Sequence, residues 1–341
     1  MTRTAKRRWS RELENEVDGI AFGSSGPVLL HGYDPPAGGK WIDDVIPGKL
    51  GALDRNTGEV LWLAPCEVGY GRGFGAGVGD GRLALVLGPS ASGHRIVRMS
   101  LANGELSEAA AIAPFDEAHV AADVCICANA GRVFAVDPTP MTEIWEYSRD
   151  GERYHHIDRA GALVLVVYTQ LATGLQGVLL LDVATGEPRG ILVLPERPVI
   201  HQIAATGPLV TLLTRDVSAM LPPEDRASFA VEFAKHPGGG SSDTLSLITL
   251  RVDASQPEPP LWHRILDTER IDQVPEVSIS ADSGKVYLVR GAYLEVLDAL
   301  SGRLLGEWAV PGLDEQVAWS VVDGAGLLAE ERRISIFELP A

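Results

Sequence analysis

The sequence contains few cysteines. Only Cys66, Cys125 and Cys127 occur among 341 residues, too few and too unevenly spaced for a disulfide framework, which favours a reducing compartment. Cys125 and Cys127 lie two residues apart in a strand-like run and therefore face the same side of the strand. We expect both to be small core residues rather than metal ligands or redox groups.

Long hydrophobic runs are also missing. Hydrophobic residues make up 45 % of the chain, but no run approaches the length that crosses a bilayer. The first nine residues carry Arg3, Lys6, Arg7 and Arg8, and a polar, acidic stretch follows them instead of the apolar region of an export signal. We therefore expect a soluble, cytoplasmic protein.

Positive charge is scarce. The chain has 29 Lys and Arg against 46 Asp and Glu, a formal net charge of −17, which repels nucleic-acid phosphates and acidic membranes. No basic stretch with interleaved aromatic residues offsets this charge. The composition therefore predicts neither nucleic acid nor a membrane as partner, whereas an acidic surface can still attract a basic protein.

Catalytic signatures are absent from the sequence as well. It has no Gly-x-Ser-x-Gly elbow, phosphate loop or dinucleotide fingerprint. The glycine-rich run at residues 69–77 precedes a strand-like segment rather than a helix, so we interpret it as a flexible connection and not as a phosphate site. These absences favour a protein without a cofactor and without enzymatic activity, although an enzyme is not ruled out.

What the sequence does contain is a repeat. Residues 50–62 combine an apolar run, the turn Asp-x-x-Thr-Gly-Glu and a second apolar run that ends near Trp62. This pattern predicts two antiparallel strands joined by a tight turn. Asp54 can accept hydrogen bonds from the backbone of its own turn, and Gly58 can adopt the positive φ that a side chain resists.

Imperfect copies of this pattern recur along the chain. Their equivalent anchor positions are Asp54, Ser100, Asp137, Asp182, Arg251, Asp298 and Glu338. With other short apolar runs between them, each unit supplies four strands in about 37 to 47 residues, the size of a propeller blade. We predict an all-β fold, a single seven-bladed β-propeller of four-stranded antiparallel blades over residues 1–341. An eighth blade remains an alternative in the long gap between Asp182 and Arg251.

The two ends of the chain complete each other in this prediction. The last copy, at residues 333–339, has the first strand of the motif and lacks the second. Residues 6–10 resemble the missing half, with Trp9 in the position of the tryptophan. We expect the N-terminal strand to close the blade that the C-terminal strand begins, which leaves no free edge at that seam.

Two insertions interrupt the repeats. Residues 33–48 form a loop insertion that carries Trp41, and residues 215–243 form a longer one in which Phe229 and Phe233 lie four residues apart. Pro222 and Pro223 before them and the glycines at 238–240 after them predict one short amphipathic helix. Trp41, Phe229 and Phe233 are candidate anchors for a protein partner, while an equally good reading is that the two phenylalanines pin the helix onto its own propeller.

The spacing Ala52-x-Asp54-x-x-x-Gly58-Glu59-x-x-Trp62 resembles the tryptophan-docking repeat of the pyrroloquinoline-quinone-like (quinoprotein-like) β-propellers. The resemblance covers nearly the whole chain. It implies that tryptophans dock between neighbouring blades, a role that falls to Trp9, Trp62, Trp145, Trp262 and, two residues late, Trp308. The family includes quinone-dependent dehydrogenases, outer-membrane assembly factors and scaffolds, so the motif implies a fold more than an activity.

The dehydrogenases of that family are exported, typically eight-bladed, and many carry adjacent cysteines beside the quinone. This chain has no adjacent cysteine pair, and none of its residues matches their calcium or quinone ligands. The resemblance therefore favours the branch without a cofactor.

Polar residues precede or flank the innermost strand of several predicted blades and are candidates for binding at the mouth of a central channel. They are Glu117, His119, His155, His156, His201, Gln273, Glu276 and Glu315. Imidazole and carboxylate together suit zinc or manganese, but no spacing such as His-Glu-x-x-His supports a metal. A solvated polar channel explains the same residues.

Two hypotheses follow from the sequence. The first is a non-enzymatic scaffold or regulatory subunit that binds a protein partner. The alternative is a protein that binds a small molecule or a metal at the channel mouth. An enzyme is included in this alternative.

Overall fold

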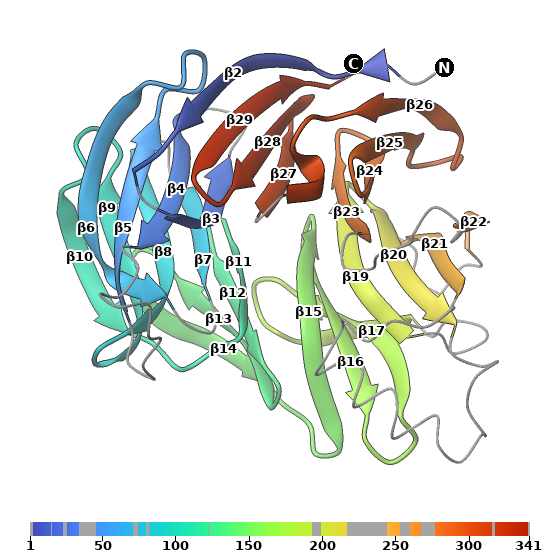
Figure 1. Ribbon diagram of the computed structural model, residues 1–341. Coiled ribbons are helices and arrows are strands. Elements are labelled where there is room, and N and C mark those ends of the chain that lie inside the picture. Colours follow the sequence, from blue (N-terminus) through green and yellow to red (C-terminus); the bar gives the residue numbers. More distant parts are fainter. Residues whose placement is uncertain are drawn as a thin grey trace. The chain divides into compact units, whose positions relative to one another are not determined.

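The computed structural model describes residues 3–14, 16–22, 26–33, 46–70, 74–79, 82–121, 123–192, 199–216, 244–252, 260–266, 277–315 and 318–339. The protein is a seven-bladed β-propeller, and each blade is a four-stranded antiparallel sheet (Figure 1). This architecture confirms the fold predicted from the repeats. We number the blades in chain order from the sheet β3-β4-β5-β6.

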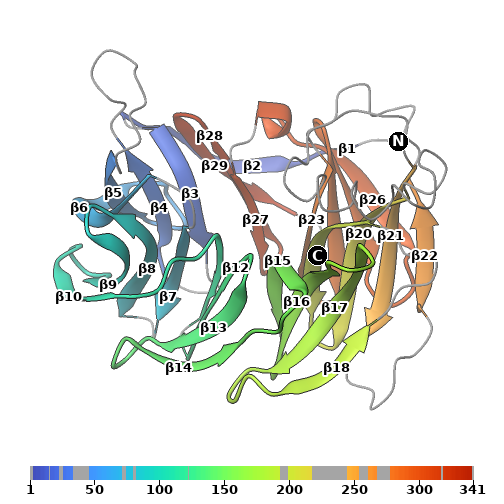
Figure 2. The ribbon, with the colours of Figure 1, turned by 90° about the horizontal axis from the view of Figure 1, so that it is seen from below.

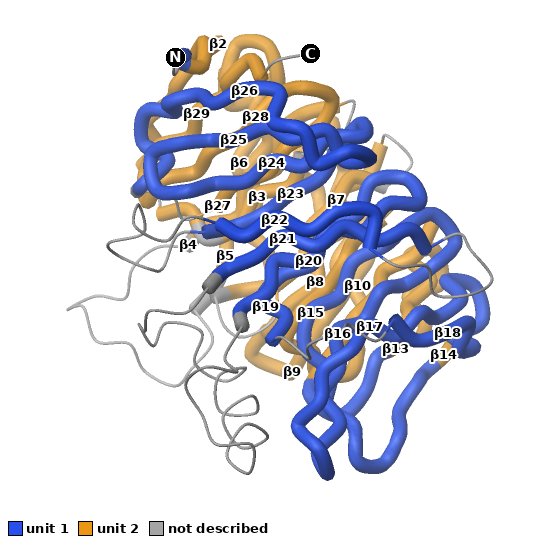
Figure 3. The backbone as a smooth tube through the Cα atoms, turned by 90° about the vertical axis from the view of Figure 1, so that its right-hand side faces the viewer, with its two compact units in different colours: residues 1–4, 130–133, 146–314 blue, residues 5–129, 134–145, 315–341 orange. Residues whose placement is uncertain are grey.

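The chain falls into two compact units (Figure 3). Unit 1 comprises residues 1–4, 130–133 and 146–314, and unit 2 comprises residues 5–129, 134–145 and 315–341. Blades 4, 5 and 6 belong to unit 1, and blades 7, 1 and 2 belong to unit 2. Blade 3 is divided between the two.

Blades 1 to 3 follow one another with the same order of strands, from the innermost to the outermost. Blade 1 contains β3 (Glu16–Phe22), β4 (Val28–Tyr33), β5 (Ile46–Leu53) and β6 (Val60–Tyr70); blade 2 contains β7 (Gly75–Gly79), β8 (Leu83–Ser90), β9 (Gly93–Ser100) and β10 (Leu106–Ala111); blade 3 contains β11 (Glu117–Val120), β12 (Cys125–Asn129), β13 (Arg132–Asp137) and β14 (Thr142–Tyr147).

Blades 4 to 6 repeat this order. Blade 4 contains β15 (Glu152–Ala160), β16 (Leu163–Gln170), β17 (Leu175–Asp182) and β18 (Pro188–Leu192); blade 5 contains β19 (Val199–Thr206), β20 (Leu209–Asp216), β21 (Thr244–Arg251) and β22 (Trp262–Ile265); blade 6 contains β23 (Val277–Asp282), β24 (Lys285–Arg290), β25 (Tyr293–Asp298) and β26 (Leu304–Ala309). A short 3-10 helix, η2 (Leu313–Glu315), follows blade 6.

Blade 7 joins the two ends of the chain. It contains β27 (Ala318–Val322), β28 (Ala325–Glu330) and β29 (Arg333–Glu338), and its fourth strand is β2 (Lys6–Glu12), in which Trp9 pairs with Ile336. The predicted blade shared by the two termini is therefore confirmed. The sequence did not predict β1 (Arg3–Thr4), which adds a fifth strand to blade 6 by pairing in parallel with Trp308 and Ala309 of β26.

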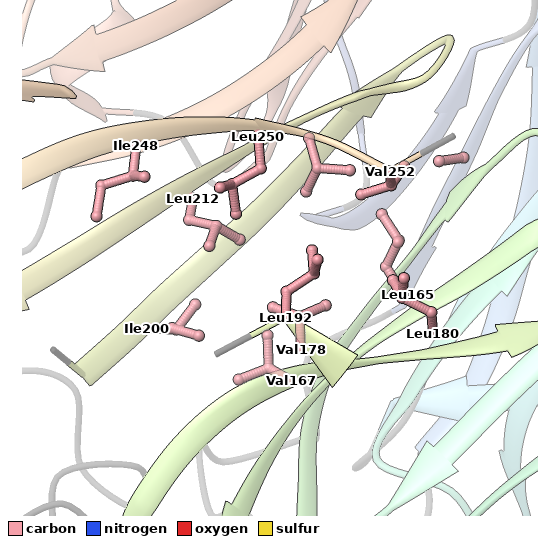
Figure 4. Close-up of a cluster of buried hydrophobic side chains, with 12 residues drawn as sticks. Leu165, Val167, Val178, Leu180, Leu192, Ile200, Leu212, Ile248, Leu250 and Val252 are labelled. Carbon is pink, nitrogen blue, oxygen red and sulfur yellow. The ribbon is translucent and has the colours of Figure 1, made fainter. Parts of the chain in front are cut away.

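Within each unit, the middle strands of neighbouring blades bury apolar side chains against each other. Between blades 4 and 5, side chains such as Val167, Val178, Leu212 and Leu250 form one buried cluster (Figure 4). Strands covered on both faces appear in sequence as continuous apolar runs rather than as alternating patterns. This is why the repeats are readable as short apolar segments between turns.

The predicted turn chemistry is present where the motif is complete. Asp54 accepts the backbone N–H groups of Asn56 and Thr57, both at 2.8 Å, and these bonds lower the pKa of its carboxyl. Gly58 has a φ of 72°. Asp182 and Asp298 make equivalent bonds within their turns, so each blade with this motif receives the same tight connection.

Blade 3 solves the same turn differently. Met141 stands where the other turns have glycine and has a φ of 52°, in the left-handed region that costs a residue with a Cβ about 1–2 kcal/mol. Its side chain is buried with Phe115 and Phe134. Burial of a methionine side chain offsets a backbone cost of this size.

Both insertions are shorter than the sequence predicted, because their ends belong to strands. Tyr33 pairs with Gly48, and Arg215 pairs with Leu245. The remainder of each insertion lies outside the described residues, together with Trp41, Phe229, Phe233 and the predicted helix. No helix in the described ranges is long and apolar enough to cross a membrane.

Candidate functional site

Three tryptophans join neighbouring blades by the same contact. The indole Nε1 of Trp9 donates to the carbonyl of Arg55 at 2.9 Å, that of Trp62 to Leu101 at 2.8 Å, and that of Trp262 to Ala299 at 2.9 Å. Each tryptophan pairs with the residue two positions before its blade's anchor, namely Ile336, Ala52 and Thr249. The shared register explains why the contact recurs.

Glycine is required where these rings rest. A Cβ on Gly58 would lie 2.6 Å from Trp9, one on Gly104 would lie 2.5 Å from Trp62, and one on Gly302 would lie 2.6 Å from Trp262. The turn glycine of one blade thus provides both the positive φ and the flat surface for the ring of the preceding blade.

The other two predicted tryptophans are buried, but Trp308 is arranged differently. Trp145 lies on β14 with 8 % of its surface exposed. Trp308 pairs with Leu294, four residues before the anchor Asp298, and its ring folds back over Gly306 of its own strand. Gly306 occupies the position where the other blades have tryptophan, and the ring of Trp308 fills the space above it.

Blade 2 has no tryptophan on its outer strand and uses an arginine instead. Arg98 on β9 donates to the carbonyl of Thr139, at 3.0 Å, in the turn of blade 3, and Glu108 of β10 holds the same guanidinium. The turn that receives this arginine is the one with Met141. With no ring to accommodate, that turn has room for a side chain at the glycine position.

Three of the predicted channel residues come together in unit 1. His155 and His156 lie on β15 and His201 lies on β19, the innermost strands of the adjacent blades 4 and 5. Charge on His156 helps to lower the pKa of His155 and of His201, so the three imidazoles interact electrostatically. We call these three residues the histidine cluster.

A chain of hydrogen bonds positions this cluster. The Nε2 of His155 lies 2.7 Å from the Thr169 hydroxyl, which accepts the side-chain amide of Gln176 at 3.1 Å. The carbonyl oxygen of Gln176 accepts the backbone N–H of Ile200 at 2.7 Å. Gln176 donates to Thr169, and the threonine hydroxyl can donate to Nε2 of His155 or accept from it, according to the tautomer of the imidazole.

β-Bulges interrupt both strands at the histidines. On β15 the register shifts between Tyr154 and Ile157, where His155 and His156 stand, and on β19 it shifts between Ile200 and Gln202, at His201. A bulge redirects side chains away from the regular alternation of a strand and is common beside binding sites. The backbone at these three residues therefore departs from regular strand geometry.

Burial keeps two residues of the histidine cluster uncharged. Burial is the main cause that lowers the pKa of His155 to about 4, with contributions from His156 and Arg153. Burial also lowers the pKa of His201 to about 4, followed by the charges of Arg215 and His156. Both imidazoles are consequently neutral at pH 7 and can donate and accept hydrogen bonds.

Sequence reasoning missed the residues that support the cluster. Thr169, Gln176 and Arg215 are buried polar residues in strands that are otherwise apolar. Their only signal in the sequence is that each interrupts or ends an apolar run, which does not distinguish a supporting side chain from the end of a strand.

Of the other predicted channel residues, Glu117 and His119 are partly buried on β11 of unit 2, where His119 pairs with Ile126. Glu315 is the last residue of η2, and Gln273 and Glu276 lie outside the described residues. Within the described ranges, no group of three or more His, Cys, Asp or Glu side chains is arranged to hold a metal ion.

The cysteines are core residues, as predicted. Cys66, Cys125 and Cys127 are buried and form no disulfide among the described residues, and burial raises the pKa of Cys66 to about 11 and that of Cys125 to about 12. The thiols of Cys66 and Cys125 are therefore protonated and unreactive at neutral pH. Cys125 and Cys127 belong to the same buried cluster.

The outer strands of the blades expose apolar side chains. Strand β6 is the longest in the described chain, and Val60, Leu61 and Leu63 on it are 43 %, 53 % and 50 % exposed. In unit 1, β18 and β22 are likewise the last strands of their sheets, and Ile191 and Ile265 on them are exposed (Figure 2). Among the described strands, β6, β18 and β22 each have a partner strand on one side only.

Comparison with known proteins places the chain by structure only. No protein-family model and no curated protein sequence matches it. The solved structure of BamB from Moraxella catarrhalis is similar to it with a TM-score of 0.52 and 14 % identity, over 98 % of this chain and 100 % of that one. Kuenenia stuttgartiensis hydrazine synthase is similar with a TM-score of 0.63 and 9 % identity, over 96 % and 97 %. At these identities the likeness shows the propeller fold alone.

Proposed function

We propose that this protein is a non-enzymatic β-propeller scaffold that binds a protein partner through the outer strands of its blades. The observation that carries the proposal is the location of exposed apolar residues. Of the thirteen large hydrophobic residues that are exposed in the described chain, nine lie on fourth strands: Val60, Leu61, Leu63, Leu106, Ile144, Ile191, Ile265, Leu304 and Leu305.

The tight joints between blades support a scaffold role. The indole bonds of Trp9, Trp62 and Trp262, and the ion pair of Glu295 with Arg264, tie one blade to the next within each unit. A rigid surface loses little conformational entropy when it binds. The tryptophan-docking spacing also supports membership of the quinoprotein-like propellers, in the branch without a cofactor.

Affinity capture from source cells tests this function. The tagged protein is compared with a variant in which Leu61 and Leu63 are serine, and with a control that carries Leu171→Ser in an exposed turn (49 % exposed). We expect a protein, identified by mass spectrometry, that is retained by the wild type and by the control and lost from the β6 variant. If no protein is retained by the wild type above background, the scaffold function is wrong.

A second function is favoured by the bulges at the histidine cluster, namely the binding of a small molecule by blades 4 and 5. Three histidines with polar support in two redirected strands form a site that can donate and accept hydrogen bonds. Imidazole ¹⁵N NMR during titration with a metabolite extract tests it. Shifts of His155, His156 and His201, with His94 and His263 unmoved, would support the site, and an unchanged spectrum would reject it.

A further inference from the structure

We infer that the outer edge of β6 is a docking strand that takes an extended, basic segment of a partner protein by strand addition. This inference rests on the proposed scaffold function and names its surface and the chemistry of its partner. It follows from the edge of β6, from its side chains, and from a strand addition that the chain makes to itself.

In the part of the chain that the structure describes, the outer edge of strand β6 has no partner strand. The strand pairs with β5 on one side and is the last strand of its sheet. Pro65 has no N–H and pairs with Lys49, and proline is accommodated in a sheet where its nitrogen faces away from the ladder. Because the orientation alternates along a strand, the N–H and C=O of Leu63, two residues before Pro65, face the same free edge, whereas Leu61 stands at the register shift between Val60 and Trp62.

The side chains of β6 suit an apolar contact. Leu61, Leu63 and Pro65 are exposed and lie on one face, opposite to Trp62 and Cys66, which are buried. Proteins usually protect such edges with charge, proline, β-bulges or short length. β6 has one proline, Pro65, and two register shifts, but its eleven residues and two half-exposed leucines still leave an apolar edge of the kind that receives another strand.

The chain shows that a blade edge of this kind accepts a basic segment. Arg3 and Thr4 of β1 add in parallel to Trp308 and Ala309 of β26, another fourth strand. β26 also exposes leucines, Leu304 and Leu305. The segment that covers it comes from the most basic stretch of an acidic chain, residues 3–11, with Arg3, Lys6, Arg7, Arg8 and Arg11.

Charge favours the same chemistry at β6. The net charge of −17 attracts a cationic segment and repels an anionic one. Glu59 is exposed immediately before the strand. Glu67 within the strand pairs with Arg95 at 2.6 Å. The preference for a cationic segment therefore rests on Glu59 and on the negative net charge of the whole chain. The partner segment is therefore extended, with alternating apolar and Lys or Arg residues.

The probes for this inference are three fluorescent twelve-residue peptides. One alternates Val and Lys, one alternates Val and Glu, and one is the Val/Lys peptide with alternate backbone amides methylated. Fluorescence polarisation measures their affinity. We expect the Val/Lys peptide to bind at least tenfold more tightly than either of the others, because it alone supplies both the charge and the backbone donors.

Substitutions in β6 locate the binding. Leu63→Pro removes one outward N–H at a position with the orientation of Pro65 and is expected to weaken the Val/Lys peptide at least tenfold, whereas Leu106→Ser on β10 leaves its affinity unchanged. Leu63→Ser, which keeps the N–H, is expected to weaken it less than Leu63→Pro, and thermal melting confirms that each variant is folded.

Several results would overturn the inference. They are equal affinity for the Val/Lys and Val/Glu peptides, affinity unchanged by Leu63→Pro, or a dimer of the protein that Leu63→Pro dissociates, which would make a second copy the occupant of β6. If these peptides fail while source-cell capture still retains a protein, the docking strand is wrong and the scaffold function stands.

Discussion

Replacing Trp62 by alanine tests how the blades are joined. The ring is 8 % exposed, its Nε1 bonds to Leu101 at 2.8 Å, and it covers Gly104 of the next blade. Large-to-small substitution of a buried aromatic residue costs about 3–5 kcal/mol. Trp62→Phe keeps much of the apolar contact and loses the indole hydrogen bond, so it should destabilise the protein less than Trp62→Ala does. The lost hydrogen bond accounts for about 1 kcal/mol of that destabilisation.

A double-mutant cycle with Gly104→Ala isolates the contact between the blades. In the wild type the new Cβ lies 2.5 Å from the ring and the backbone has a φ of 72°. Once Trp62 is alanine, only the φ cost of about 1–2 kcal/mol remains. Gly284→Ala, with a φ of 75° and no atom within 4 Å of the new Cβ, gives that backbone cost alone.

Urea unfolding of the wild type, Trp62→Ala, Gly104→Ala and the double variant provides the measurement, together with Gly284→Ala in the presence and absence of Trp62. We expect Gly104→Ala to destabilise the wild type clearly more than it destabilises the Trp62→Ala variant, with an interaction energy above about 1 kcal/mol. Gly284→Ala should cost the same with and without Trp62. Additive effects of Trp62→Ala and Gly104→Ala, within about 0.3 kcal/mol, would refute the docking contact.

Three further predictions concern other parts of the molecule. The folded pKa of about 4 for His155 and His201 lies below the ordinary 6.5, so the unfolded state binds more protons between these values and the free energy of unfolding should fall from pH 7 to 4. That loss is at most about 3 kcal/mol per histidine and should be smaller in His155→Gln, whereas equal pH profiles of unfolding would contradict it. Deletion of residues 1–11 should leave the outer edge of β29 without a partner and cause aggregation in size-exclusion chromatography, and a monomer of wild-type stability would contradict the shared blade. Glu295 lies between Arg264 and Arg290, and Glu295→Gln should lower the free energy of unfolding by about 3 kcal/mol. Glu108→Gln, at the exposed pair with Arg98, should lower it by less than about 1 kcal/mol. Equal losses would contradict the buried network.

The architecture was predictable because local signals repeat. Asp54, Gly58 and Trp62 each perform a local or nearest-neighbour task, and the recurrence of their spacing identifies a blade without any long-range information. The same reasoning placed Trp9 in the last blade. It did not predict β1, because two residues without a repeat signal gain their partner only through the tertiary structure.

The candidate site was only partly predictable. The sequence singled out His155, His156 and His201 as polar residues on innermost strands, and the structure brings these three into one cluster. The bulges that shape them depend on the register with β16 and β20, which no local pattern encodes. Likewise, Leu61 and Leu63 read as ordinary strand residues, since exposure of one face depends on what lies beside the blade.

Hydrogen exchange of β6 in the presence of the captured partner tests the central claim most directly. Strand addition gives the outward amide of Leu63 a hydrogen-bond acceptor, so its exchange should slow at least tenfold on binding, while the amides of β10 should exchange as before. Unchanged exchange at Leu63, in a complex that slows exchange in other strands, would contradict docking at this strand.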